Sequence, residues 1–188
     1  EWQAKIKEIV EGLGMDFFSS PFDPTAVTFL ESIGISAYKV ASPEIIDIPL
    51  LRLIGATRKP VIMSTGMATL SEIDEAVRTL RESGTTDLLL LKCTSAYPAP
   101  ASEMNLRTIP HMAQTFKVPV GLSDHTMGNE VAVAAVALGA CAIEKHFTLS
   151  RKDGGPDSGF SMEPAEFKAM VDMVRTVEGA VGTINYQP

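Results

Sequence analysis

Hydrophobic and polar positions along this chain follow two patterns, one typical of amphipathic helices and the other typical of buried strands. Apolar residues three or four positions apart predict helices, and short, nearly continuous apolar runs predict strands. The two patterns alternate, which predicts six strands separated by helices. Strands are expected at residues 16–20, 37–41, 61–65, 88–93, 120–124 and 142–147, and helices at 2–13, 24–33, 50–55, 70–83, 106–116, 130–138 and 164–177.

The strand runs are apolar throughout, without the alternation of a sheet that has one face in water. Such runs predict parallel strands that are covered by helices. Several helix ends carry their own signals. Asp23 before Pro24 is a typical helix start, Thr69 with Glu72 forms the pattern of a capping box, and Gly84 is placed to end the helix that Thr69 opens.

Polar side chains follow every predicted strand, and this distinguishes the two folds that repeated strand–helix units form. A doubly wound sheet gathers its ligand at one switch point, and no GxGxxG follows the first strand. A TIM barrel gathers residues from many strand ends into one site. We therefore predict an α/β fold, a TIM (β/α)8 barrel of which about six units are present. The polar segments are SSPFD, ASPE, STGM, CTSAYP, SDHT and KHFT.

Composition and charge bear on partners and compartment. The chain is 45% hydrophobic and 21% charged, and no apolar run approaches the roughly 20 residues of a membrane helix. A net charge of −7 argues against a nucleic-acid surface. Cys93 and Cys141 lie in apolar strand runs without CxxC spacing, so reduced, buried thiols and a cytoplasmic location are expected. The chain opens on Glu1 inside a helical pattern, which suggests a piece of a longer protein.

Two histidines end neighbouring predicted strands. His125 and His146 follow the last two strands, and adjacent barrel strands would bring their imidazoles to one face. Imidazole with oxygen ligands suits manganese, iron, cobalt or zinc. A divalent metal site with open positions is therefore expected, and ordinary hydrogen-bonded loop histidines are the alternative. His111, in a helical segment, is expected at the surface.

Lysines and small hydroxyl residues at the strand ends predict a site for an anion. Lys39 lies inside an otherwise apolar strand, where an ammonium group must be paired or bind an anion, and Lys92 and Lys145 occupy similar places. Lys39 could also form a Schiff base or reach solvent from the strand edge. Hydroxyl groups suited to carboxylate or phosphate oxygens are supplied by Ser20, Ser42, Ser64, Thr65, Ser95 and Ser123.

Other polar residues near the strand ends each allow a functional and a structural interpretation. Glu44 follows Ser42 and is a candidate general acid or base, with solvation as the alternative. Asp124 and Glu144 were interpreted as supporting or helix-facing groups, because a neighbour in a strand faces the opposite side. Asp157 lies on the glycine-rich segment DGGPDSGF, either in a mobile loop that closes over substrate or simply in a turn. Tyr97 either forms a wall of the pocket or packs in the core.

Taken in order, these segments resemble the sialic acid synthase family. The resemblance covers about residues 14–182, and KCTSAYP with GGPDSGFS is most similar to the pseudaminic acid synthase branch. It implies a transferase that condenses phosphoenolpyruvate with an open-chain 2-acetamido sugar. The product would be a nine-carbon sugar, pseudaminic acid or alternatively N-acetylneuraminate or legionaminate. The segments are SSPFD, YKVASPEI, PVIMSTGM, KCTSAYPAP, GLSDHT, IEKHFTL and GGPDSGFSMEP.

The resemblance also implies residue roles and partners. Metal ligands would be His125 and His146, with Mn²⁺ as the expected ion and Mg²⁺ or Co²⁺ as alternatives. Glu44 would be a catalytic carboxylate, with Tyr97 and Asp157 near the sugar. Phosphoenolpyruvate would be bound by Lys39, Ser42, Ser64, Ser95 and Ser123, with Ser20 as a neighbour.

The family pattern also extends beyond this chain. It implies that residues 1–182 are the third to eighth barrel units and that 183–188 begin a linker to a C-terminal antifreeze-like domain, in a homodimer. Two other functions stay open: a Schiff-base aldolase that uses Lys39, and a truncated binding fragment without catalytic activity.

Overall fold

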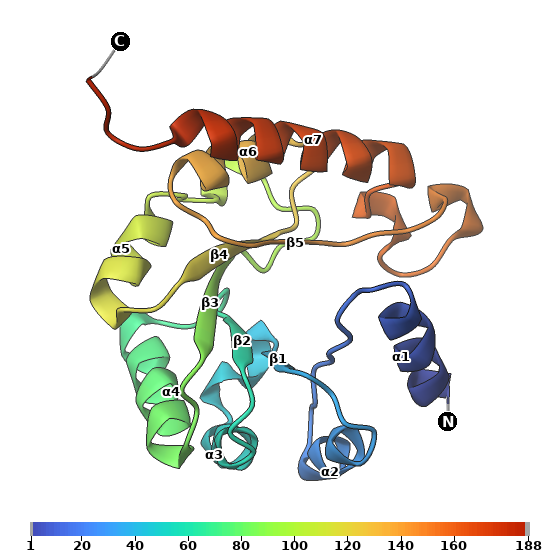
Figure 1. The fold of residues 1–188 in the computed structure, drawn as a ribbon, viewed down its shortest axis with the longest axis vertical. Coiled ribbons are helices and arrows are strands. Elements are labelled where there is room, and N and C mark those ends of the chain that lie inside the picture. The colour runs from blue at the N-terminus through green and yellow to red at the C-terminus, as the bar shows by residue number, and fades with distance from the viewer. Residues whose placement is uncertain (1, 187–188) are drawn as a thin grey trace. The chain divides into compact units, whose positions relative to one another are not determined.

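The computed structural model describes residues 2–186, in which α-helices and β-strands alternate (Figure 1). The strands are short and run parallel where their register is defined, and four 3₁₀ turns, η1 to η4, lie in the connections. The elements are α1 (Trp2–Gly12), α2 (Pro24–Ser32), β1 (Tyr38–Val40), η1 (Ser42–Ile46), α3 (Ile48–Ala56), β2 (Val61–Ser64), α4 (Leu70–Ser83), β3 (Leu88–Cys93), η2 (Ala101–Glu103), α5 (Thr108–Phe116), β4 (Val120–Asp124), α6 (Glu130–Ala137), β5 (Ile143–Lys145), η3 (Arg151–Asp153), η4 (Ser158–Phe160) and α7 (Pro164–Val181).

The strands follow one another in the sheet in the order β1-β2-β3-β4-β5. Since this order equals the order in sequence and never reverses, the sheet has no switch point of the doubly wound kind. The chain divides into two compact units, residues 1–90 and 91–188, and the boundary falls within β3. No helix within residues 2–186 is long and apolar enough to cross a membrane.

In the first unit, α3 and α4 pack side by side beside β2 (Figure 1). Ile54 and Leu80 are fully buried in this layer. The contact requires Gly55, because a Cβ at that position would lie 2.6 Å from Cβ of Ser83. The capping box predicted at the start of α4 is confirmed: Thr69 and Glu72 bond each other's backbone N–H.

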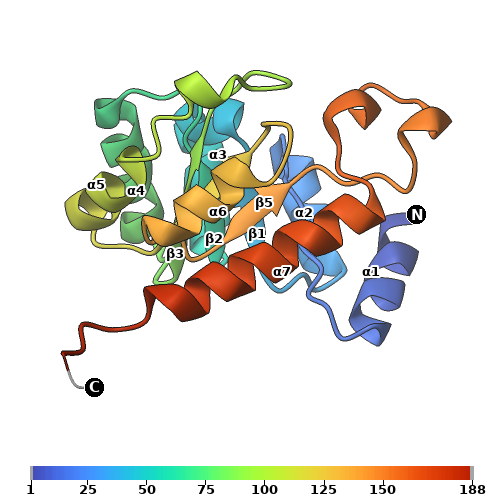
Figure 2. The same ribbon diagram turned by 90° about the horizontal axis from the view of Figure 1, so that it is seen from above.

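In the second unit, α7 lies along α6 and β5 (Figure 2). A buried cluster of Ala132, Met162 and Met170 joins these elements, and Ile143 packs against it. Gly121 permits the close approach of β4 to the residue before β5, since a Cβ there would lie 2.6 Å from the carbonyl oxygen of Ala142.

Two sequence-based expectations about this fold were wrong. Residues 16–20 form no strand and make only one bridge, in which Ser19 pairs with Tyr38. The N–H of Lys39 donates to Ser19, but the next bond of a parallel ladder needs an N–H at position 21, and Pro21 has none. Cys141 is exposed rather than buried, because it lies ahead of β5, whereas Cys93 is buried as expected.

A buried ion pair joins the ends of β4 and β5. Lys145 Nζ lies 2.7 Å from Asp124 Oδ2, and the two side chains are 2% and 0% exposed. Lys145 also donates to the carbonyl oxygen of Thr126, while Asp124 Oδ1 accepts from the N–H and hydroxyl of Thr126. Both charges are therefore paired and hydrogen-bonded, as burial demands.

A second polar cluster, in the first unit, links α2 to β1. Glu31 accepts hydrogen bonds from the hydroxyl of Tyr38 at 2.8 Å and from Nζ of Lys59 at 2.6 Å. Partial burial raises the pKa of Glu31, but the bonds from Lys59 and Tyr38 outweigh it, and the net pKa lies below its ordinary value of 4.5. Burial and Glu31 raise the pKa of Tyr38.

We expect Glu31 to make stability depend on acid pH. A carboxylate whose pKa is lower in the folded state stabilises above the unfolded pKa and loses this effect as pH falls through the folded value. On acidification, the free energy of unfolding should fall further in wild type than in Glu31→Gln, as measured by urea unfolding. The difference should be less than about 1 kcal/mol, because the pair is partly exposed. Lys59→Met should reduce the same difference, and identical pH profiles for all three proteins would contradict the assignment.

Loss of the buried ion pair between Lys145 and Asp124 should lower the free energy of unfolding much more. Lys145→Met leaves Asp124 as an uncompensated buried charge and should lower the free energy of unfolding by about 3–5 kcal/mol. The matched control is Lys168→Met, which breaks an exposed pair with Asp172 and should cost less than about 1 kcal/mol. Urea unfolding of both variants measures the contrast, and equal losses would show that the Lys145 pair is not essential to the fold.

Candidate functional site

The register of β4 and β5 brings the two predicted histidines together. Ser123 pairs with Glu144 and Asp124 with Lys145, so His125 and His146 come next, side by side beyond the strand ends. Their ring centroids are 5.2 Å apart, with the rings edge to face. The pair lies wholly within the second unit.

The contacts of His125 orient its ring. Its Nδ1 lies 3.0 Å from the carbonyl oxygen of Thr94 and 3.9 Å from Sγ of Cys93. A carbonyl can only accept, so the tautomer that satisfies this contact carries the proton on Nδ1 and leaves the lone pair on Nε2. Burial lowers the pKa of His125, but the contacts with Cys93 and Thr94 outweigh it, and the net pKa is raised.

His146 is half-buried and faces a carboxylate. Its Nδ1 lies 3.7 Å from Oδ2 of Asp157, which is an electrostatic contact rather than a hydrogen bond. Burial and the neighbouring His125 lower the pKa of His146. The imidazole is therefore biased toward the neutral form, which is the form that binds metal ions.

Two aromatic rings complete the wall around the imidazoles. Tyr97 packs against His125 at a centroid distance of 4.3 Å, and Phe160 packs against His146 at 5.0 Å. Tyr97 and Phe160 also touch each other. Tyr97 is half exposed, and burial of the remainder raises its pKa. Phe160 was missed in the sequence, because the conformation of a glycine-rich loop has no periodicity from which its position could be predicted.

Glu144 faces the histidines, so of its two sequence interpretations, a supporting or a helix-facing group, the helix-facing one was wrong. Glu144 stands two residues before His146 and so shares its face of the strand, whereas Lys145 is the immediate neighbour that points to the other side. Ser123 Oγ donates to Glu144 Oε1 at 2.6 Å. The carboxylate of Glu144 raises the pKa of both histidines by its charge. Because side chains two apart in a strand share a face, the spacing of Glu144 from His146 already predicts that both point to the same side.

The predicted set of three similar lysines was also wrong. Lys145 is committed to Asp124 on the opposite face from the histidines. Lys92 is buried and donates to the carbonyl oxygen of Cys93 and to the hydroxyl of Thr94. Burial lowers the pKa of Lys92.

Lys39 in the first unit fits an anion site best. Its side chain is buried and donates to Oγ of Ser64 at 2.7 Å and to the carbonyl oxygen of Val40. The hydroxyl of Ser42 accepts from the N–H of Gly66 at 3.0 Å. The structure thus brings Lys39 and Ser64 into direct contact and buries Ser42 at the start of η1.

Glu44 occupies the same turn as Ser42. Its Oε2 is buried and has no hydrogen-bond partner among residues 2–186. A buried carboxylate oxygen without a partner is costly, so it marks a position where a ligand or water would be stabilised. Ser20 is half-buried in the same unit, and Ser95 in the second unit lies 4.0 Å from Sγ of Cys93.

The donor set fits a metal ion with open positions. Within residues 2–186 there is no ready-made cluster of three or more histidine, cysteine or acidic ligands. The two imidazoles supply nitrogen donors, and the carbonyl oxygen of Thr94 fixes the His125 ring through Nδ1, as the hydrogen-bond partners of metal-binding histidines commonly do. Asp157 and Glu144 add negative charge nearby. His111 is exposed on α5, as expected.

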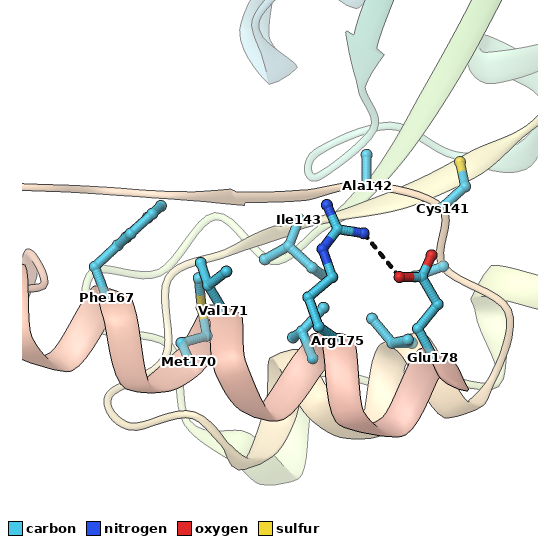
Figure 3. Close-up of a pocket in the computed structure, with 11 residues that line it drawn as sticks. Cys141, Ala142, Ile143, Phe167, Met170, Val171, Arg175 and Glu178 are labelled. Atoms are coloured by element: carbon cyan, nitrogen blue, oxygen red, sulfur yellow. Dashed lines mark hydrogen bonds and ion pairs between the residues drawn. The ribbon is translucent and has the colours of Figure 1, made fainter. Parts of the chain in front are cut away.

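A half-open pocket of about 180 Å³ lies elsewhere in the second unit, between α7, α6 and the start of β5 (Figure 3). Its walls include Ile143, Phe167 and Met170, and exposed Cys141 stands at its edge. Arg175 and Glu178 pair across its rim. None of the predicted site residues is among those that line it.

Comparison with known proteins identifies the family. The NeuB family model matches residues 1–186. A pseudaminic acid synthase of Campylobacter jejuni is 46% identical over 97% of this chain and 53% of its own length. An N,N'-diacetyllegionaminic acid synthase of the same species is 45% identical over 88% of this chain and 50% of its own length. The chain thus spans about half the length of the curated relatives it matches.

A solved structure extends the likeness to the fold. The N-acetylneuraminic acid synthetase of Leptospira borgpetersenii matches with a TM-score of 0.94 at 34% identity, over 98% of this chain and 65% of that one. The predicted fold class, an α/β fold built from part of a TIM barrel, is confirmed. The resemblance to sialic acid synthases is confirmed as well. The chain belongs to the NeuB family.

Proposed function

We propose that this chain is the metal-binding and phosphoenolpyruvate-binding part of a synthase that condenses phosphoenolpyruvate with an open-chain 2-acetamido sugar. The observation that carries the proposal is the pair of imidazoles, 5.2 Å apart, with Nδ1 of His125 engaged by Thr94. Family membership and relatives named as pseudaminic and legionaminic acid synthases support it.

His125 and His146 would hold a divalent metal, with Mn²⁺ as the first choice and Mg²⁺ or Co²⁺ as alternatives. When bound, the metal supplies Lewis acidity for the aldehyde oxygen of the sugar. Thr94 fixes the ring of His125, and Asp157 faces Nδ1 of His146. Tyr97 and Asp157 would contact the sugar, since both stand beside the imidazoles.

The anion would be held by an ammonium group and hydroxyl groups. Lys39 is buried and supplies the positive charge, while its contact with Ser64 fixes both groups in place. Such charge-assisted hydrogen bonds suit carboxylate and phosphate oxygens. The other hydroxyls of the set are Ser20, Ser42, Ser95 and Ser123.

Glu44 would handle the protons of the attacking water. Carbon 3 of phosphoenolpyruvate would bond to the aldehyde carbon, whose oxygen takes up a proton to become a hydroxyl, and water would add its oxygen at carbon 2. The bond between carbon 2 and the phosphate oxygen then breaks, phosphate leaves with that oxygen, and carbon 2 becomes a ketone. The water must lose a proton in this step, and the unpartnered Oε2 of Glu44 is an acceptor suited to take it.

We propose pseudaminic acid as the product, with legionaminate or N-acetylneuraminate as alternatives, because KCTSAYP and GGPDSGFS favour that branch. A panel of 2-acetamido sugars, each incubated with phosphoenolpyruvate, Mn²⁺ and the complete gene product, tests this through phosphate release. The full-length protein would be a cytoplasmic homodimer. Residues 183–186 have no regular structure, as a linker to an antifreeze-like domain would, and 187–188 lie outside the described residues.

Removal of both imidazoles should abolish metal binding. We expect His125→Ala/His146→Ala to lose bound Mn²⁺, measured by calorimetry and by elemental analysis after dialysis, because two nitrogen ligands are lost. The matched control is His111→Ala, which removes an exposed histidine from α5 and should leave metal content unchanged. Unchanged metal content in the double variant would refute the ligand assignment.

Loss of the Glu44 carboxylate should slow turnover. Glu44→Gln keeps the size of the side chain but cannot accept the water's proton, so kcat should fall about 10²–10⁴-fold with Mn²⁺ binding retained. Glu75→Gln, on the exposed face of α4, is the control and should keep normal turnover. A normal phosphate-release rate for Glu44→Gln would remove Glu44 from the mechanism.

A further inference from the structure

The side chain of Arg151 makes three hydrogen bonds within the loop that follows the candidate metal site. Arg151 opens η3 in the long loop that connects β5 to α7, visible beyond the end of β5 in Figure 2. Its Nη1 and Nη2 donate to the two carboxylate oxygens of Glu166 at 3.0 and 2.6 Å. Its Nε donates to the carbonyl oxygen of Ser161 at 3.0 Å.

The backbone of Arg151 adds a further bond between the two ends of this loop. Its N–H donates to Oε1 of Glu163 at 2.9 Å, and the N–H of Glu163 donates to Oε2 of Glu166 at 2.9 Å. Arg151 is thus bonded to three residues at the far end of its own loop, including the first turn of α7. We call the contacts of Arg151 with Ser161, Glu163 and Glu166 the Arg151 clasp.

The segment inside the clasp carries two of the groups that surround the imidazoles. Asp157 Oδ2 lies 3.7 Å from Nδ1 of His146, and the Phe160 ring packs on His146 at 5.0 Å. The hydroxyl of Ser161, one of the clasp residues, donates to the carbonyl oxygen of Asp157 at 2.8 Å. A continuous chain of bonds therefore runs from Arg151 to the backbone of Asp157.

Apart from the clasp, this segment is held by local turn bonds and by the packing of Phe160 on Tyr97 and His146. Gly154 and Gly155 adopt positive φ values of 76° and 117°, and glycine loses more conformational entropy on ordering than any other residue. Residues 152–157 are exposed. The loop ends stay joined through the bridge between Phe147 and Met162, so loss of the clasp would loosen the segment and leave the fold intact.

We propose that Arg151 is a positioning residue that holds Asp157 and Phe160 against the metal-binding imidazoles. This inference rests on the proposed function, since the positioned groups matter only if a sugar binds beside them. The guanidinium fork is required, because a single ammonium cannot bond both oxygens of Glu166 and the Ser161 carbonyl in this planar arrangement.

The test uses Arg151→Lys and Glu166→Gln in the complete gene product, with Lys152→Ala as the matched control. Lys152 is the exposed neighbour of Arg151. Hydrogen–deuterium exchange of a peptide covering residues 152–161 should be about tenfold faster in both clasp variants and unchanged in the control. The thermal midpoint should hardly move, because Arg151 and Glu166 are partly exposed.

Kinetics provide the second readout. In the clasp variants kcat/KM for the amino sugar should fall about tenfold or more, while KM for phosphoenolpyruvate stays at the wild-type value. Unchanged exchange in Arg151→Lys, or faster exchange with an unchanged kcat/KM for the sugar, would overturn the proposal. If the wild-type protein releases no phosphate with any sugar, the proposed function fails, and exchange alone then shows whether the clasp orders the loop.

Discussion

The buried ion pair between Asp124 and Lys145 is the interaction on which the candidate metal centre depends. Each partner is the immediate chain neighbour of a histidine, and their contact across β4 and β5 fixes the register in which His125 and His146 face each other. The pair has satisfied hydrogen bonds on both sides, so it tolerates complete burial. A shift of one residue in either strand would place the two imidazoles on opposite faces of the sheet.

Side chains alternate between the two faces of these strands, so the ion pair and the candidate site residues lie on opposite faces. The face that carries Asp124 and Lys145 is occupied by a closed network, whereas the other face presents Ser123, Glu144 and the histidines. On the face that carries the histidines, the charged residue of β4 and β5 is Glu144, and its negative charge favours a bound cation. Lys145, one of the three lysines that the sequence suggested for anion binding, instead pairs with Asp124 across the two strands.

Much of the fold was predictable because its signals are local. The predicted strands 88–93 and 120–124 coincide with β3 and β4, and the Thr69 capping box begins α4 where expected. The failures are places where the outcome depends on a partner. Residues 16–20 have the apolar pattern of a strand, but Pro21 cannot continue the ladder, and the clasp of Arg151 joins residues whose proximity no periodicity encodes.

The serines of the predicted anion site are not equivalent donors. A hydroxyl has one proton to donate, and Ser123 directs it to Glu144 at 2.6 Å. Ser42 and Ser64 instead accept, from Gly66 N–H and from Lys39 Nζ. Among residues 2–186 neither hydroxyl proton has an acceptor, and the contacts with Gly66 and Lys39 polarise the hydroxyls toward donation. Ser42 and Ser64 are therefore suited to bind an anion as they stand. Ser123 must first release Glu144, so it is connected to the candidate metal centre rather than being a simple anion donor.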